Sequence, residues 1–277
     1  MDEQHIDCVF PLISGYGGED GTLQGLLELS NIPYVGADVA ASANAMDKAL
    51  TRLFAAAAGL KQPRCLILKK DEFLTHEIEF EQKVDFGYPV YVKPVSLGSS
   101  VGISRVAHPS QLREAINKAF KYESKIMIEE GIEGKEIKVA VLGNDDPITG
   151  DICEITVPKG AVNDYETKHI KFTSTKRIPA DITEDTADKV KHEAIAIYKE
   201  LECEGMARVD FFLNNDGEVF FNEINTVPGI GKHSIYSQMF ESAGLPIKDM
   251  LTELIDTAFK NKQQVSETSN DTFKEIF

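Results

Sequence analysis

Basic residues are in short supply in this sequence of 277 residues. Lys and Arg together number 29 against 45 Asp and Glu, which gives a formal net charge of −16 at pH 7. Binding to a nucleic-acid backbone requires clustered Lys and Arg, so this charge argues against a nucleic acid as partner. In so acidic a chain, a lysine inside an apolar segment becomes a candidate for a specific role.

Cysteine is also scarce, and targeting signals are missing. The four cysteines are far apart and form no CxxC pair, which argues against a zinc site or a disulfide framework and fits a reducing cytoplasm. The start shows no basic segment followed by an apolar stretch, and no run of about 18 apolar residues occurs. We therefore expect a cytoplasmic protein that does not enter a membrane.

The sequence contains no internal repeat, no long linker and no GxxxxGK[ST] phosphate-binding loop. What it does contain is an alternation of strand and helix patterns, which predicts an α/β or α+β enzyme fold. We expect strands at 7–13, 89–94, 125–128 and 136–142, and helices at 23–29, 42–58, 112–120 (with Ser110 as N-cap) and 184–202. From Gln263 onward the chain is polar and aperiodic, which predicts a frayed tail.

The most informative segment is a predicted β-hairpin. Two strand-like runs, 207–213 and 218–225, flank the turn sequence Asn-Asn-Asp-Gly at 214–217. A plain four-residue loop pairs Asp210 with Phe221 and Arg208 with Glu223. Because side chains alternate between faces, we expect Arg208, Asp210, Glu223 and Asn225 to share one face of the hairpin.

Two carboxylates and an amide on one face suggest a cation site. Hard oxygen ligands suit Mg²⁺ or Mn²⁺, whereas zinc prefers His and Cys. A solvated polar face on an edge hairpin is the alternative. The apolar neighbours Val209, Phe211 and Ile224 favour a buried sheet, in which an unpartnered carboxylate is too costly to persist.

Several other residues could hold phosphate. The stretch Gly98–Gly102, GSSVG, could cradle phosphate oxygens with backbone N–H groups, although a plain serine-glycine turn is the simpler interpretation. Lys93 lies in an apolar strand, where a lysine is expensive unless it is paired or reaches solvent. Lys48 and Lys168, taken singly, would be ordinary surface lysines.

Taken together, the segments resemble the D-alanine–D-alanine ligase family of the ATP-grasp superfamily. The matching pieces, in the family's order and spacing, are GEDGTLQGLLELSNIPYVG, AMDKALT, YPVYVKPVSLGSSVGIS, IEEGIEGKEIKVAVLG, DYETKH, GMARVDFF and FFNEINTVPG followed by HS. They run from residue 18 to 234 and so cover most of the chain. The resemblance implies an ATP-grasp fold of two α+β subdomains, preceded by a remnant of an N-terminal α/β domain.

The resemblance also implies domains and roles. The expected domains are 1–41, a remnant of the N-terminal substrate domain; 42–130, the ATP-grasp central subdomain; 131–262, the C-terminal metal- and substrate-binding subdomain; and 263–277, a tail. Nucleotide contacts are expected from Lys48, Lys93, Ser99, Ser100, Val101, Gly102, Glu129, Ile132, Glu136 and Lys168. Two Mg²⁺ or Mn²⁺ ions are expected on Asp210, Glu223 and Asn225, with catalytic roles for Ser99, Arg208, Gly229, Ser234 and Lys168.

The implied reaction joins two D-alanine molecules with ATP, through an acyl phosphate, for peptidoglycan precursor synthesis. Metal ions and lysines would neutralise the phosphoryl oxygens. Arg208 and the Gly229 N–H would stabilise the tetrahedral oxyanion, and Ser234 would hold the second substrate's carboxylate. Lys168 would lie on a loop that excludes water. The expected partners are small molecules, and the family's common dimeric state leaves a homodimer open.

Three departures from the family pattern bear on activity. The glycine-rich N-terminal opening and its substrate-orienting glutamate do not occur, so we expect an N-terminally shortened ligase. Ser14 stands where the family has histidine, and His169 where it has tyrosine. A histidine in that loop also occurs in ligases that make D-alanyl–D-lactate, which keeps a D-lactate or D-serine substrate open.

Three further alternatives remain open. The chain could be an ATP-grasp ligase for another acid or amine. It could be an ATP- and Mg²⁺-binding fragment without turnover, or a structural protein whose acidic hairpin is coincidental.

Overall fold

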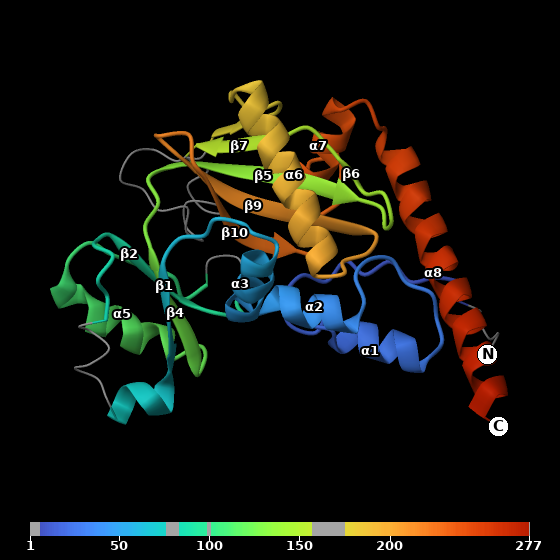
Figure 1. Ribbon diagram of the computed structural model, residues 1–277, viewed down its shortest axis with the longest axis horizontal. Helices are drawn as coiled ribbons and strands as arrows, with labels where there is room; N and C mark the ends of the chain where they lie inside the picture. Colours follow the sequence, from blue (N-terminus) through green and yellow to red (C-terminus); the bar gives the residue numbers. More distant parts are fainter. Residues whose placement is uncertain (1–5, 76–82, 99–100, 157–174, 277) are drawn as a thin grey trace.

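Two antiparallel sheets and the helices that cover them make up the chain (Figure 1). The computed structural model describes residues 6–75, 83–98, 101–156 and 175–276, with side chains up to residue 263. Within that part of the chain, all strand pairings in both sheets are antiparallel. The predicted mixed class is confirmed, in its α+β form.

The smaller sheet has four strands in the order β1-β4-β2-β3. They are β1 Cys65–Lys69, β2 Val90–Pro94, β3 Ser104–Val106 and β4 Lys125–Glu130. Helix α5, Leu112–Ala119, buries an apolar stripe against this sheet, and the two form a hydrophobic core of their own. The predicted helix is confirmed, but Ser110 is not its N-cap. Ser110 lies in a short 3-10 turn, Pro109–Gln111, whose N-cap is His108.

The larger sheet has six strands. They are β5 Gly134–Leu142, β6 Ile148–Thr149, β7 Cys153–Thr156, β8 Thr175–Arg177, β9 Met206–Asn214 and β10 Val219–Asn225. Five of them follow the order β10-β9-β5-β7-β8, and β6 pairs with β5. The central strands β5 and β9 pair over their full lengths, from Gly134 opposite Asn214 to Leu142 opposite Met206.

The two faces of the larger sheet carry different side chains. One face buries Ile137, Val139 and Val141 of β5 beneath α6, Glu184–Glu200, which crosses the sheet in Figure 1. On the opposite face, Ala140 and Leu142 pack with α7, Ile235–Ser242, and α8, Ile247–Ile276. Charged residues lie on the same face, where Lys138 of β5 is opposite Asp210 of β9.

The β9–β10 hairpin has a register that differs from the prediction. Val219, rather than Glu218, lies opposite Leu213, because the loop closes with Glu218 O accepting from Asn214 N at 3.0 Å. The register then shifts between Phe221 and Glu223. The shift is a β-bulge that leaves one extra residue on β10. Glu223 consequently lies opposite Asp210, and not opposite Arg208.

The predicted helix 42–58 is two helices, α2 Val39–Met46 and α3 Lys48–Ala57, following α1 Thr22–Leu29. The break is at Asp47, whose backbone is extended and whose side chain accepts from Ala49 N and Leu50 N. Asp47 thus acts as the N-cap of α3, which the alanine-rich composition does not reveal. Apolar residues of α2 and α3 lie in the core of the larger sheet, although the predicted boundary at 42 groups them with the smaller one.

The ends of the chain also differ from the predictions. Segment 7–13 is not a strand, because its only ladder contact among the described residues is a parallel bridge between Val9 and Tyr34. The backbone of α8 continues helical to Ile276, where an irregular tail was expected. Within the described ranges, no helix has the length and apolar character needed to cross a bilayer.

Candidate active site

A row of charged side chains crosses the larger sheet on its partly polar face. Glu223 of β10 lies opposite Asp210 of β9, and Lys138 of β5 lies opposite Asp210 from the other side. Asn225 lies opposite Arg208 in the adjacent position. Because directly opposed residues share a face, the prediction that the four hairpin residues point the same way is confirmed. The predicted register of the hairpin was wrong by one residue, but the extra residue in the β-bulge returns Glu223 and Asn225 to the face that carries Asp210 and Arg208.

Two cations hold the Asp210 carboxylate. Arg208 donates from Nε to Oδ1 at 2.7 Å and from Nη2 to Oδ2 at 3.0 Å, and Lys138 Nζ donates to Oδ2. Burial alone would raise the pKa of Asp210, but Arg208 and Lys138 hold that pKa below its usual value. Burial likewise works against the charged form of Lys138, yet Asp210 and Glu136 raise the pKa of Lys138 above its usual value.

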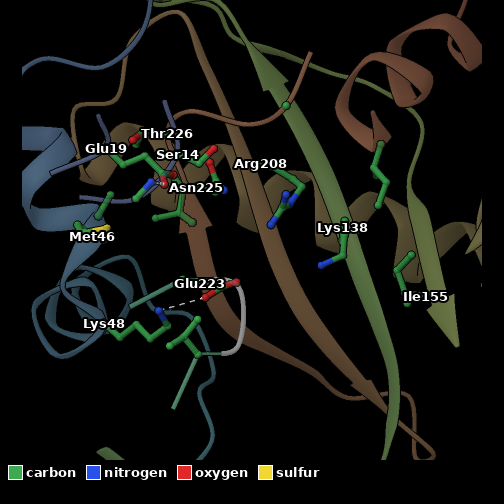
Figure 2. Close-up of a pocket in the computed structure, with 17 residues that line it drawn as sticks. Ser14, Glu19, Met46, Lys48, Lys138, Ile155, Arg208, Glu223, Asn225 and Thr226 are labelled. Carbon is green, nitrogen blue, oxygen red and sulfur yellow. Dashed lines mark hydrogen bonds and ion pairs between the residues drawn. The ribbon is translucent and has the colours of Figure 1, made fainter. Parts of the chain in front are cut away.

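Lys48 reaches the same row from the first turn of α3. Its Nζ lies 3.3 Å from Glu223 Oε2 and donates to Leu97 O at 3.1 Å. The break at Asp47 sets this position, since the Lys48 backbone N–H donates to Val95 O at 3.0 Å, at the end of β2. Figure 2 shows the ion pair between Lys48 of α3 and Glu223 of β10.

The loop before α1 covers one end of the row. Ser14 Oγ donates to Val227 O at 3.4 Å, and Gly15 N donates to the Glu19 carboxylate. Burial raises the pKa of Glu19, while Arg208 opposes this rise. Glu19 therefore lies within electrostatic range of the charged row, although it is far from it in sequence.

These residues enclose a cavity of about 600 Å³. Its wall includes Lys48, Lys138, Arg208, Glu223, Asn225 and Gly229, together with Ser14, Glu19, Gly98 and Val101. Figure 2 shows Arg208 and Lys138 on neighbouring strands, with Glu19 and Asn225 close to each other at one side. A cavity with three cationic side chains in its wall suits an anionic ligand such as a nucleotide.

Lys93 and Glu129 form a second ion-pair group, in the smaller sheet. Lys93 Nζ lies 2.6 Å from Glu129 Oε2, and Arg52 Nη1 of α3 lies 3.2 Å from Glu129 Oε1. Both Lys93 and Glu129 are buried. Of the two possibilities for a lysine in this strand, pairing is therefore the one that occurs, and Lys93 does not reach solvent.

Not all of the predicted site residues meet in one place. Ile132 lines a different cavity, of about 580 Å³, together with Glu130, Glu133, Asn214 and Asp216. Glu136 lies beside the charged row, with its Oε2 3.5 Å from Lys138 Nζ. Ser99, Ser100, Lys168 and His169 lie outside the described residues.

Gly229 and Ser234 lie close together beyond β10. An atom added at the Cβ position of Gly229 would be 3.1 Å from Ser234 Oγ. Ser234 is the N-cap residue of α7, yet its side chain makes no capping hydrogen bond to the helix. The 600 Å³ cavity is lined by Gly229 and by Ile235, the residue that follows Ser234 and begins α7.

Sequence reasoning missed Lys138, Glu19 and Arg52. Lys138 carried a usable signal, because it lies in the apolar run Ile137–Val141 much as Lys93 lies in its strand. Glu19 and Arg52 carried none, since a glutamate in a glycine-rich loop and an arginine on a helix are ordinary surface residues. Their roles depend on contacts between distant segments.

Asp210, Glu223 and Asn225 form a donor set that fits Mg²⁺ or Mn²⁺. All three offer oxygen, and Mg²⁺ is commonly bound by one or two carboxylates together with substrate phosphates. Asn225 Oδ1 also accepts from Val227 N at 3.0 Å, which fixes the amide orientation. In the part of the chain that the structure describes, no cluster has three or more His, Cys, Asp or Glu side chains that could hold a metal. The set reaches three ligands through the Asn225 amide.

Comparisons with known proteins give the chain's class and family. The description "D-ala D-ala ligase C-terminus" matches residues 54–256, and "D-ala D-ala ligase N-terminus" matches residues 1–37. Two antiparallel sheets, with a cationic cavity lined by strands of the larger sheet and by the loop after β2 of the smaller one, are the architecture of an ATP-grasp enzyme. The chain belongs to the D-alanine–D-alanine ligase family, which confirms the resemblance stated above.

Individual relatives support this assignment. A D-alanine–D-alanine ligase of Geobacillus thermodenitrificans is 43% identical over 265 residues, 95% of this chain and 72% of the relative. The solved D-alanine–D-alanine ligase of Coxiella burnetii is 35% identical with a TM-score of 0.83, covering 98% of this chain and 72% of that one. The VanG D-Ala:D-Ser ligase of Enterococcus faecalis is 39% identical with a TM-score of 0.82, covering 91% and 73%.

Proposed function

We propose that the chain is an ADP-forming ligase that joins two D-alanine molecules for peptidoglycan precursor synthesis. Membership of the D-alanine–D-alanine ligase family supports the substrates. One observation carries the proposal. The cations Lys48, Lys138 and Arg208 line the same cavity as the oxygen ligands Glu223 and Asn225.

The nucleotide would be held between the two sheets. Lys48 and Lys93 would contact ATP phosphates, and the loop Ser99–Gly102 would cover them. Glu129 and Ile132 are assigned to the adenine and Glu136 to the ribose. Because Lys93 is paired with Glu129 at 2.6 Å, a phosphate that binds Lys93 competes with an existing ion pair.

Asp210, Glu223 and Asn225 would hold the metal. A bound Mg²⁺ neutralises the transferring phosphoryl oxygens. In the first step, a carboxylate oxygen of the first D-alanine attacks the γ-phosphorus, and ADP leaves. In the second, the amine of the second D-alanine attacks the acyl carbon, loses a proton, and inorganic phosphate leaves.

Arg208 and the Gly229 N–H are assigned to the tetrahedral oxyanion of the second step. Preorganised donors at such a charge are among the largest contributions to catalysis. Arg208 is already held in place by its two hydrogen bonds to Asp210. Ser234, whose side chain is free of a capping bond to α7, would receive the second carboxylate. Lys168 would help exclude water from the acyl phosphate.

The test is D-alanine-dependent phosphate release by the 277-residue chain with ATP and Mg²⁺, with the product weighed by mass spectrometry. We expect a D-alanyl–D-alanine mass, and we expect Asp210→Ala to abolish it. Lys135→Met is the control, since Lys135 lies on β5, the strand paired with β9, but forms an ion pair with Glu154 on the opposite face of the sheet. ATP binding without release would identify a nucleotide-binding fragment, and no binding would remove the ligase proposal.

The second substrate has two specific alternatives, D-serine and D-lactate. The VanG relative is named a D-Ala:D-Ser ligase, and His169 stands where the family has tyrosine, as in ligases that use D-lactate. Competing D-alanine against D-serine and D-lactate across pH decides between them. A strict D-alanine preference at every pH removes both alternatives.

Location and assembly complete the proposal. We place the enzyme in the cytoplasm, because its four cysteines are free thiols and its substrates are small cytoplasmic molecules. The family's common state suggests a homodimer. Light scattering coupled to size-exclusion chromatography gives the mass in solution, and a mass near 30.6 kDa would show a monomer instead.

A further inference from the structure

Lys138 stands between the cavity and the Asp210 carboxylate. Lys138 and Arg208 both line the cavity, whereas Asp210 lies behind them and is 2% exposed. Arg208 contacts both oxygens of Asp210, and Lys138 contacts Oδ2. An ion that approaches Asp210 from the cavity therefore meets an ammonium group first.

The position of Lys138 is fixed by the fold. Its residue lies directly opposite Asp210 in the β5–β9 pairing and opposite Cys153 in the β5–β7 pairing. Glu136, two residues earlier on the same face, has its Oε2 3.5 Å from Lys138 Nζ. The lysine is 7% exposed, so its charge is not dispersed into solvent. It is held by one carboxylate on each of two adjacent strands.

A divalent ion next to Asp210 would lie beside both Lys138 and Arg208. Like charges at such separations repel strongly where solvent is excluded. The open end of the row is different, because Glu223 is a third exposed at its side chain, where its Oε2 lies 3.3 Å from Lys48 Nζ. Asn225 adds an amide oxygen at that end of the same cavity.

We propose that the Lys138 ammonium takes the place of one divalent cation beside Asp210, so that the chain binds one Mg²⁺ with its nucleotide instead of two. Of the three ligands proposed above for the metal, Asp210 is then occupied by Lys138, and the remaining ion is held by Glu223 and Asn225. The Lys138 ammonium thus supplies a positive charge at the phosphate site. The family resemblance alone implies a second metal ion at that position. This inference rests on the proposed function, because it concerns the metal that accompanies ATP.

The test counts Mn²⁺ ions bound per chain in the presence of the non-hydrolysable analogue β,γ-imido-ATP. Free Mn²⁺ is followed by electron paramagnetic resonance during titration of the full chain. We expect one bound Mn²⁺ for the wild-type chain and two for Lys138→Met, which removes the ammonium but keeps most of the side-chain volume. Lys138→Gln is the second variant, and circular dichroism verifies that each variant is folded.

Two controls separate charge from packing. Lys138→Arg keeps a cation at the position and is expected to bind one ion, as is Lys135→Met, which changes a lysine on the other face of β5. Two Mn²⁺ in the wild-type chain would overturn the inference and leave the proposed function intact. One ion in both wild type and Lys138→Met would also overturn it, because another feature would then set the number. Failure of the wild-type chain to bind Mn²⁺ with nucleotide would overturn both proposals.

Discussion

Lys93 and Glu129, on the adjacent strands β2 and β4, approach to 2.6 Å with both side chains buried. Arg52 contacts the other oxygen of the same carboxylate at 3.2 Å. One carboxylate thus compensates both the buried Lys93 and the partly buried Arg52. Removal of Glu129 and removal of Lys93 should therefore change the stability of the protein by different amounts.

Glu129→Gln is therefore expected to destabilise the chain more than Lys93→Met does. The first change leaves the buried Lys93 and the partly buried Arg52 without their carboxylate, and loss of one partner costs about 3 kcal/mol in comparable buried pairs. The second leaves Glu129 paired with Arg52, and we expect about 1 kcal/mol. Urea unfolding followed by circular dichroism gives both values. Equal losses would show that Arg52 does not compensate Glu129.

Lys48→Met is expected to separate binding from stability. Its partner Glu223 is a third exposed at the side chain, so the ion pair contributes less than about 1 kcal/mol to folding. Loss of a phosphate contact should weaken ATP binding by about tenfold to a hundredfold, in line with one charge-assisted hydrogen bond. Calorimetric titration with ATP and Mg²⁺ measures the affinity. An unchanged Kd would remove Lys48 from the nucleotide site.

The raised pKa of the Glu204 carboxyl group leads us to expect that the free energy of unfolding falls as pH rises. Burial, followed by the charges of Asp38, Glu28 and Asp145, raises its pKa from 4.5 to about 7. Between these values the folded chain keeps a proton that the unfolded chain has lost, so the free energy of unfolding falls as pH increases. Below pH 4.5 this penalty is absent, and above pH 7 it is complete.

Glu204→Gln removes this pH-dependent penalty. The amide oxygen can still accept from Asn261 Nδ2, which contacts Glu204 Oε2 at 2.5 Å. Because Glu204 is only half-buried, we reduce the expected gain at pH 8 to roughly 1–2 kcal/mol. Urea unfolding at pH 5 and pH 8 should show the variant gaining on the wild type only at the higher pH. A gain of equal size at both values would contradict the assignment.

A single methyl group added at Gly134, the first residue of β5, is expected to destabilise the protein. Its φ is +158°, and a Cβ added there would lie 2.0 Å from Leu213 O on the paired strand β9. Gly134→Ala must push the two central strands apart, and we expect a loss of about 2 kcal/mol. Thermal unfolding measures the change.

Gly25 is the matched control for that experiment. It lies inside helix α1, and a Cβ added there meets no atom within 4 Å. Gly25→Ala is expected to raise stability by about 0.5–1 kcal/mol, because alanine loses less backbone entropy in a helix. If both variants shifted the melting temperature in the same direction, the contact with Leu213 would not be the cause.

The β9–β10 hairpin shows how far the sequence could lead. Its turn and its alternation correctly place Arg208, Asp210, Glu223 and Asn225 on one face, because a period of two is a local property. The register was wrong, since the loop is closed one position differently and the bulge adds a residue on β10. Neither feature has a strong local signature, and the two errors together left the face unchanged.

Lys138 marks the limit of that reasoning. Its partner Asp210 is 72 residues away along the chain, and only the pairing of β5 with β9 brings the two together. The split at Asp47 is a second example. An aspartate among alanines reads as part of one long helix until its side chain is seen to cap the next one.

The separate hydrophobic core of the smaller sheet has a consequence for how the molecule opens. The buried residues of that core and those of the larger sheet's two cores are different sets, so each sheet can lose its packing without the other. Native-state hydrogen exchange should then release the amides of β1–β4 as one group, at a lower free energy than those of β5 and β9. A nucleotide that touches both sheets would tie the two groups together and protect them jointly.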